Sequence, residues 1–245
     1  MSMFSCKLPR LLAVLGAVTA GFILPAAIRA QTPGIEGIWQ ISHPKTLFVP
    51  EDGKPIPFNA DGKKQYDANK AAAAKGDVSF DDTMTTCATP GQPRLMLTNE
   101  PFVLFVTPRM VTIVYQWNRV FRQILLGKPM VSPAVGNAWW QFGTRQGRSI
   151  AKWQGNALMV HTDTFLDGRL IDALIPSTDG LSFDERLSLS NPSTLEDHIT
   201  ITDPDIFTRS WDTVVTYKRL PDSRFPFPED VCFERLKGNQ PAIQR

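Results

Sequence analysis

Four side chains are of the types that transfer protons in enzyme active sites: His161, Asp163, Tyr115 and Glu185. The ordinary pKa of histidine lies near neutrality, so His161 could serve as a general acid or base. Asp163 follows two residues later, and this spacing places both side chains on one face of an extended strand. Tyr115 could donate a proton or polarise a carbonyl group. This set predicts proton-transfer chemistry that needs no cofactor.

Each of these side chains also has a structural interpretation. A lone histidine is most often a hydrogen-bonded structural residue, and a buried tyrosine is commonly a core residue with a bonded hydroxyl group. Glu185 alternates with Phe183 and Leu187, so it is expected among apolar neighbours. A carboxylate in such a place is costly unless it is paired with a cation or used in chemistry. The sequence leaves both interpretations open.

A second set consists of aromatic and cationic side chains that could hold a ligand: Trp117, Arg119, Arg122, Trp139, Trp140 and Arg186. Arg119 or Arg122 could stabilise a negatively charged oxygen of a substrate. The two adjacent tryptophans could line the mouth of a pocket, although aromatic pairs are also ordinary core residues. Arg186 and Glu185 are neighbours and face opposite sides of a strand, so Arg186 is expected to pair with a carboxylate on another strand.

Several reaction classes are excluded because their motifs are missing. No glycine-rich phosphate loop or dinucleotide fingerprint follows an expected strand, and the sequence contains no G-x-S-x-G nucleophile elbow. The three histidines, His43, His161 and His198, lack the helical spacing of a zinc site. We therefore expect neither a metal nor a cofactor.

The elements that must position these residues are predicted to be strands, because apolar residues recur mostly every second position. Gly155-Asn156, between two such segments, is typical of a two-residue hairpin turn. Many short strands separated by turns predict an all-β barrel or sandwich. The expected strands cover residues 35–42, 102–107, 110–118, 119–126, 149–153, 157–164, 182–189, 195–202 and 213–219.

The first expected strand carries the pattern Gly37-Ile38-Trp39. A Gly-x-Trp first strand suggests a small antiparallel barrel of the kind that encloses one hydrophobic molecule. We expect Trp39 to close one end of that barrel, with Arg219 or Lys218 of the last strand stacked on its ring.

A long segment, residues 44–93, separates the first strand from the rest and is rich in Pro, Gly, Ala and Asp. This composition predicts long loops. One short helix is expected over residues 61–75, with Asn59 or Asp61 as its N-cap.

The first 30 residues have the features of a cleaved export signal. Lys7 and Arg10 precede an apolar run over residues 11–28, and Ala30-Gln31 offers a cleavage point after a small residue. The alternative is a membrane anchor, but the run is near the lower length limit for a span. Removing the leader eliminates three cationic residues and no acid, which changes the formal net charge from +2 to −1.

These features predict a periplasmic or secreted protein with a single β-barrel domain over residues 31–245. No later stretch is apolar enough to span a membrane, so no span is expected after cleavage. A net charge of −1 gives no electrostatic basis for nucleic-acid binding.

Two cysteines follow the leader, Cys87 and Cys232. In an oxidising compartment an even pair of cysteines indicates a disulfide. A metal site is the alternative, but neither residue has His or Cys neighbours at ligand spacing. Closing so long a loop would contribute about 4–5 kcal/mol in the chain-entropy model.

Several motifs together resemble a large, poorly characterised family of bacterial secreted proteins. The resemblance covers most of the chain after the leader. Besides the Gly-x-Trp strand, it rests on residues 87–94 (CATPGQPR), 113–124 (IVYQWNRVFRQI) and 153–160 (WQGNALMV), on Glu185-Arg186 and Asp203-Pro204, and on the closing Cys232-Phe233-Glu234.

The resemblance implies an antiparallel lipocalin-like (calycin) barrel with long loops and one or two short helices, and no firm activity. This chain departs from the family pattern at Gln116, at His161 and in residues 139–143. We expect a barrel whose cavity binds a small apolar or aromatic molecule. The alternative is a cofactor-independent lyase, isomerase or hydratase that acts on such a molecule.

Overall fold

The computed structural model describes residues 34–127 and 143–243 of the chain. The expected export signal and the pair Trp139 and Trp140 lie outside these residues. Within the described part, no helix is both long and apolar enough to cross a membrane.

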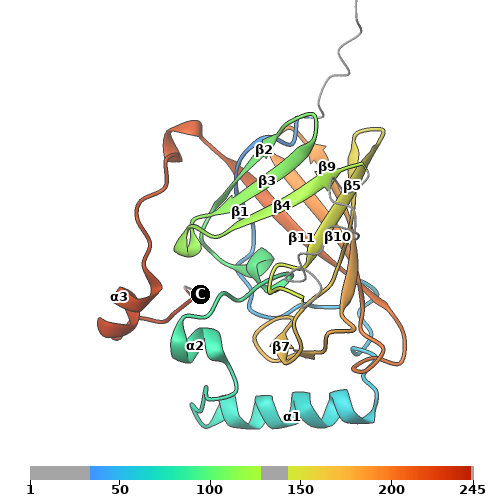
Figure 1. Ribbon diagram of the computed structural model, residues 1–245, viewed down its shortest axis with the longest axis vertical. Helices are drawn as coiled ribbons and strands as arrows, with labels where there is room; N and C mark the ends of the chain where they lie inside the picture. The colour runs from blue at the N-terminus through green and yellow to red at the C-terminus, as the bar shows by residue number, and fades with distance from the viewer. Residues whose placement is uncertain (1–33, 128–142, 244–245) are drawn as a thin grey trace, which may run out of the picture. The chain divides into compact units, whose positions relative to one another are not determined.

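Nine strands close into a barrel (Figure 1), with neighbours in the order β1, β11, β10, β9, β6, β5, β4, β3, β2 and back to β1. The expected all-β barrel is therefore confirmed. Its strands are β1 (Gly37–Ile41), β2 (Phe102–Val106), β3 (Met110–Tyr115), β4 (Phe121–Leu126), β5 (Arg148–Gln154), β6 (Ala157–Asp163), β9 (Ser182–Asn191), β10 (Thr194–Thr202) and β11 (Trp211–Leu220).

Neighbouring strands of the barrel run antiparallel except for β4 and β5, which are parallel. Antiparallel neighbours can be joined by tight turns, whereas a parallel pair requires a long return connection. β4 ends at Leu126 and β5 begins at Arg148, a separation in the chain that meets this requirement.

Alternation along each strand separates an inner from an outer face, as the sequence pattern predicts. In β3 the buried residues Val111, Ile113 and Tyr115 alternate with half-buried ones. In β6 Val160 and Thr162 are buried between outward-facing neighbours. The inner faces form one continuous apolar core, into which a few polar side chains are placed.

One end of the barrel, referred to here as the plugged end, is closed by Trp39. Its ring is fully buried, its indole nitrogen donates to the carbonyl of Ile35 (2.9 Å), and the Arg219 guanidinium lies 4.1 Å from the ring centroid. The predicted stacking of Arg219 on Trp39 is confirmed. Gly37 is required beside it, because its φ is +131° and a Cβ there would lie 2.3 Å from Nη1 of Arg219.

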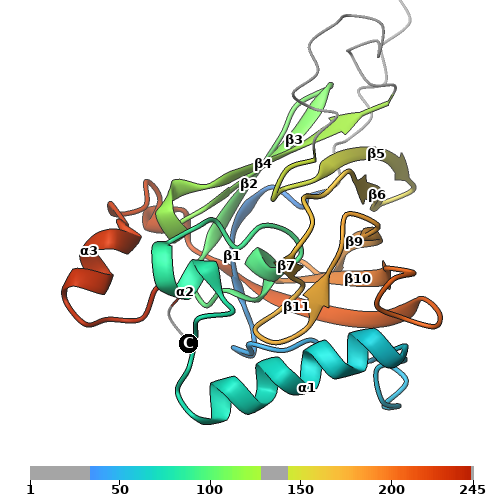
Figure 2. The ribbon, with the colours of Figure 1, turned by 60° about the horizontal axis from the view of Figure 1, so that its bottom comes forward.

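The opposite end, the covered end, lies under segments that are not barrel strands (Figure 2). These are α1 (Ala60–Ala74), α2 (Asp82–Thr86), the 3₁₀ turn η1 (Arg94–Leu97) and the small sheet of β7 (Arg169–Leu170) and β8 (Pro176–Ser177). The expected N-cap of α1 is confirmed, since the side chain of Asn59 accepts from the Gly62 amide (2.8 Å). Asn69 then ties the helix to the loop after β7 through the Leu174 carbonyl (2.9 Å).

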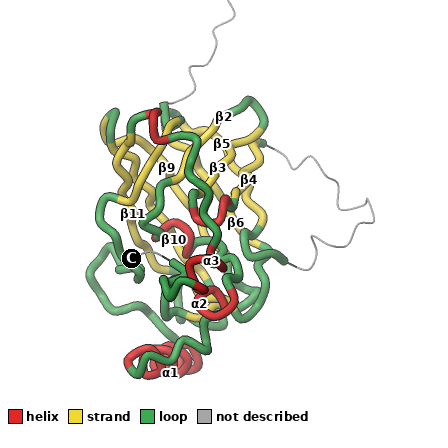
Figure 3. Tube along the Cα trace, turned by 90° about the vertical axis from the view of Figure 1, so that its left-hand side faces the viewer, coloured by secondary structure: helices red, strands yellow, loops and turns green. Residues whose placement is uncertain are grey.

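The C-terminal segment returns to the covered end through α3 (Cys232–Lys237), which lies beside α2 in Figure 3. The predicted disulfide joins Cys87, at the end of α2, to Cys232. Beyond α3, the carbonyl of Ala242 accepts from the indole nitrogen of Trp117 (2.8 Å), a residue of the turn η2 (Trp117–Arg119). The short turn η4 (Asp222–Arg224) follows β11.

Candidate functional site

The barrel interior contains a fully buried ion pair between Arg122 of β4 and Glu185 of β9. The contact is bidentate, with Nη1 to Oε1 at 2.9 Å and Nη2 to Oε2 at 2.5 Å. Both side chains are about 1% exposed. The apolar neighbours expected for Glu185 therefore surround a paired carboxylate, which lowers the cost of burying it.

Two further N–H groups of Arg122 are also bonded. Nε donates to the Ser149 hydroxyl (3.1 Å) and Nη2 to the Thr162 hydroxyl (2.8 Å), and the two hydroxyl groups lie 2.9 Å apart. The ring of Phe183 lies 5.5 Å from the guanidinium. Burial opposes the charge of Arg122, but the charge and hydrogen bonds of Glu185 outweigh it and raise the pKa of Arg122 above its ordinary value.

A second carboxyl group, Asp197 of β10, is buried beside this pair. It is 1% exposed, and its Oδ1 has no hydrogen-bond partner among the described residues. Burial, followed by the charge of Glu185, raises the pKa of Asp197 well above its ordinary value. Two carboxyl groups thus face one guanidinium, and the arrangement favours a protonated Asp197. We call Arg122, Glu185 and Asp197 the interior cluster.

Two buried tyrosines lie near the interior cluster. Burial raises the pKa of Tyr115 to about 12 and the pKa of Tyr217 well above its ordinary value, so both hydroxyl groups keep their protons. The Tyr115 hydroxyl accepts from Nε2 of Gln92 (3.1 Å), and the Tyr217 hydroxyl donates to the Met96 carbonyl (3.1 Å). Of the expected proton-transfer residues, the structure places Tyr115 and Glu185 inside the barrel.

His161 and Asp163 lie on the outer wall, so the expected four-residue set does not converge. Their side chains are 51% and 34% exposed, because alternation in β6 turns them away from the interior. His161 contacts Asp184 through Nδ1 (2.8 Å), and Asp163 pairs with Arg148 (3.2 Å). The barrel wall separates both side chains from Glu185, which corrects the expectation of one shared acid–base site.

The expected ligand-binding set also divides. Arg122 alone belongs to the interior cluster. Arg186 faces outward and donates to the Ser188 hydroxyl (2.9 Å). It forms no ion pair with a carboxylate of the described residues, contrary to the expectation. Trp117 is fully buried in η2, and Nη2 of Arg119 reaches the Phe227 carbonyl at 3.5 Å. The structure assigns these two residues to packing outside the strands.

A pocket of about 200 Å³ lies at the covered end of the barrel. All of its lining residues lie outside the barrel strands, in segments before α1, in α2, in and after η1, between β7 and β8, and near the C-terminus. They are Pro44, Lys45, Thr46, Met84, Arg94, Leu97, Thr98, Asn99, Ala173 and Ile243. This end pocket is mostly apolar. No local sequence pattern predicts it, because its walls are distant along the chain.

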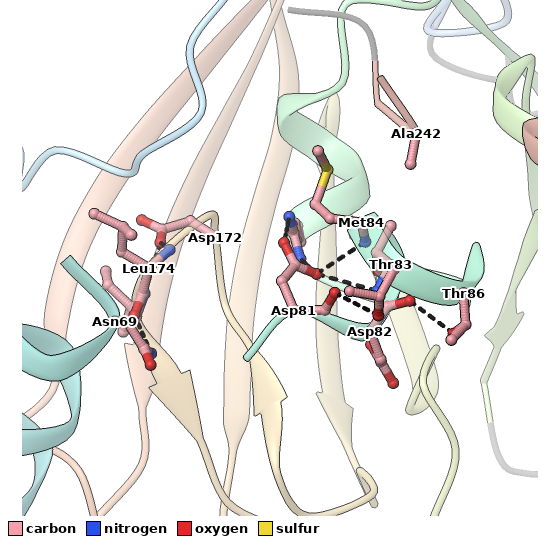
Figure 4. A network of polar contacts seen from close by, with 12 residues as sticks. Asn69, Asp81, Asp82, Thr83, Met84, Thr86, Asp172, Leu174 and Ala242 are labelled. Atoms are coloured by element: carbon pink, nitrogen blue, oxygen red, sulfur yellow. Dashed lines mark hydrogen bonds and ion pairs between the residues drawn. The ribbon is translucent and has the colours of Figure 1, made fainter. Parts of the chain in front are cut away.

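Buried carboxylates hold the walls of the end pocket in place (Figure 4). Asp81 caps α2 by accepting from the amides of Thr83 (3.1 Å) and Met84 (3.4 Å), and it forms a bidentate ion pair with Arg94 (2.9 and 2.6 Å). Asp172 fixes the loop that presents Ala173 by accepting from three backbone amides. The positions of Met84, Arg94 and Ala173 are therefore set by hydrogen bonds rather than by apolar contact alone.

A second hollow of about 270 Å³ is lined by Pro50, Glu51, Asp52, Pro55, Pro57, Arg209, Trp211 and Asp212. Its lining is mainly polar and acidic, unlike that of the end pocket. Among the described residues, no group of three or more His, Cys, Asp or Glu side chains is arranged to hold a metal ion.

Comparisons with known proteins leave the family open. No family model matches the chain, and no curated protein matches it. Among solved structures, a mutant of the fluorescent protein UnaG is similar at 12% sequence identity and a TM-score of 0.35, over 77% of this chain and 97% of that one. The barrel assignment rests on the closed strand order of this chain, and membership of the bacterial secreted family stays a prediction.

Proposed function

We propose that this protein binds a small, largely apolar molecule in the end pocket. The observation that carries the proposal is the pocket itself, whose walls Met84, Leu97, Ala173 and Ile243 are apolar and come from four separate segments. Ligand pockets are typically concave and apolar with a few polar groups that fix orientation, and this lining has that character. The Asp81–Arg94 ion pair and the disulfide hold the walls before any ligand arrives, which lowers the entropic cost of binding.

The disulfide also supports the proposed location. Disulfides persist in oxidising compartments, so the Cys87–Cys232 bond fits a periplasmic or secreted protein better than a cytosolic one. The sequence of the first 30 residues points in the same direction.

The binding proposal is tested by filling the pocket. In the Ala173→Phe variant a ring occupies the space between the walls, and Ala71→Phe, on the exposed face of α1, is the matched control. We expect native mass spectrometry of protein purified from the periplasm without detergent to show a retained small molecule in the wild type and the control, and none in Ala173→Phe. Equal retention by all three proteins would place the ligand elsewhere and contradict the proposal.

A second candidate function is proton transfer catalysed in the barrel interior. It is favoured by the unpartnered Oδ1 of Asp197, a buried carboxyl group that lies near Tyr115 and is suited to donating a proton. Such a lyase, isomerase or hydratase would need no cofactor. The test is to incubate the extracted ligand with wild-type protein and with Asp197→Asn. Product formed only by the wild type would support catalysis, whereas an unchanged ligand in both reactions would leave binding as the function.

A further inference from the structure

We propose that the ligand of the end pocket is a compact organic anion whose carboxylate pairs with Lys45. This inference rests on the proposed binding function and names the chemical class of ligand. It begins with Lys45, which follows β1, lines the pocket and is half-buried. Its ammonium group donates to the carbonyl of Val214 (3.0 Å). An ammonium group carries three donors, and one neutral carbonyl satisfies neither its charge nor its remaining protons.

No carboxylate of the described residues balances the charge of Lys45. Lys45 takes part in no ion pair within residues 34–127 and 143–243. Burial lowers the pKa of Lys45, and no charge in the described part of the chain counters that effect. A partly desolvated cation without a counter-charge is unfavourable until an anion arrives.

The other charged groups around the pocket are already paired. Both terminal nitrogens of Arg94 bind Asp81, so this pair is neutral as a unit. The nearby carboxylate of Asp172 is turned toward three backbone amides, those of Phe48, Leu174 and Ile175. Lys45 is therefore the one lining residue of the described pocket with charge left to offer a ligand.

The rest of the lining sets the shape of the partner. Met84, Leu97 and Ala173 present apolar surface, whereas Thr46, Thr98 and Asn99 supply neutral polar groups. Lys45 would repel a cationic ligand. A neutral apolar ligand would bury the ammonium group of Lys45 further without supplying a counter-charge. A small apolar body with a single carboxylate satisfies the walls and the cation together.

The test uses three fluorinated compounds of nearly equal size and different charge: 4-fluorophenylacetate, 4-fluorophenylacetamide and 4-fluorophenethylamine. Their affinities are measured by ¹⁹F NMR against wild-type protein, Lys45→Met, Lys45→Arg and Lys64→Met, where Lys64 is an exposed residue of α1. Each compound is also titrated against Ala173→Phe, so that binding outside the pocket is recognised.

We expect wild-type protein to bind the carboxylate about tenfold or more tightly than the amide, in line with the usual strength of a charged hydrogen bond. Lys45→Met should lose this preference while binding the amide as before, and Lys45→Arg and Lys64→Met should keep it. Equal binding of amide and carboxylate by the wild type overturns the assignment of an anion but leaves the binding function standing. Failure of all three compounds to bind overturns both the assignment of an anion and the proposed binding function.

Discussion

The interior cluster and the end pocket both place charge away from water, but they differ in how completely that charge is paired. In the interior, each guanidinium nitrogen of Arg122 has a partner. Burial and the charge of Glu185 raise the pKa of the second carboxyl group, Asp197, which favours its neutral form. In the end pocket, Lys45 has one neutral carbonyl. Complete pairing is what a folded core requires of a buried charge, whereas incomplete pairing beside open space is what a binding site retains for its ligand.

The largest effect is expected where pairing is complete. Arg122→Met leaves the carboxylate of Glu185 buried without its cation, which should lower the free energy of unfolding by about 3–5 kcal/mol. Chemical denaturation measures this loss. The double variant Arg122→Met with Glu185→Leu should recover most of it, because neither member of the ion pair is then left as a buried charge without its partner. A single variant as stable as the wild type would show that the cluster does not hold the barrel together.

Removing the disulfide should have the next largest effect. Replacing Cys87 and Cys232 by serine frees a loop of sequence separation 145 and should cost about 2–5 kcal/mol of stability. The same change loosens the attachment of Ile243, a pocket wall. Ligand retention should therefore fall more than in a variant that loses the same amount of stability through a change away from the pocket. Denaturation and native mass spectrometry of the variant, with Arg122→Met as the stability-matched control, separate the two consequences.

A smaller, pH-dependent effect is expected at Asp197. Because its pKa in the folded protein is raised, the native state holds a proton that the unfolded chain releases above the ordinary value of 3.8. Stability should therefore decline as pH rises from that value toward the raised pKa. Asp197→Asn abolishes this decline, so the unfolding temperature of the variant should rise relative to that of the wild type as pH rises. Parallel pH profiles for the two proteins would contradict a protonated Asp197.

The smallest change in stability is expected for Lys45→Met, within about 0.5 kcal/mol of the wild type, because the residue is half-buried and has one neutral acceptor. A large loss on thermal unfolding would mean that Lys45 belongs with the structural charges of the interior, and the contrast between the two regions would fail.

The parts predicted from sequence are those that depend on near neighbours or on alternation. The stacked pair of Trp39 and Arg219, the Asn59 cap and the strands follow from local patterns. The inward direction of Glu185 follows from its apolar neighbours at every second position. The same reasoning places Asp197 between Leu195 and Ile199, which is the signal that could have identified it as an interior residue.

The remaining features depend on which distant segments meet. Arg122 becomes the partner of Glu185 because β4 and β9 face each other across the interior, and strand direction alone does not specify such a meeting. The outward position of His161 follows from alternation, but its chemical type suggested a role that its position does not support. The end pocket is harder still to predict from the sequence, because residues as far apart as Lys45 and Ile243 line it.

The parallel seam between β4 and β5 has a consequence for how the molecule opens. It is registered at only three positions, from Ile124 opposite Ser149 to Leu126 opposite Ala151. The seam between β1 and β2 is similarly short, but it contains Trp39, whose buried ring packs under Arg219. The bond from Arg122 to Ser149 crosses the β4–β5 seam, but the seam remains short, whereas β9 and β10 pair along their whole length. Local unfolding should therefore begin at the β4–β5 seam, and its amides should exchange with deuterium before those of β9 and β10. An opened seam exposes strand edges, which makes this side of the barrel the place where self-association would start under stress.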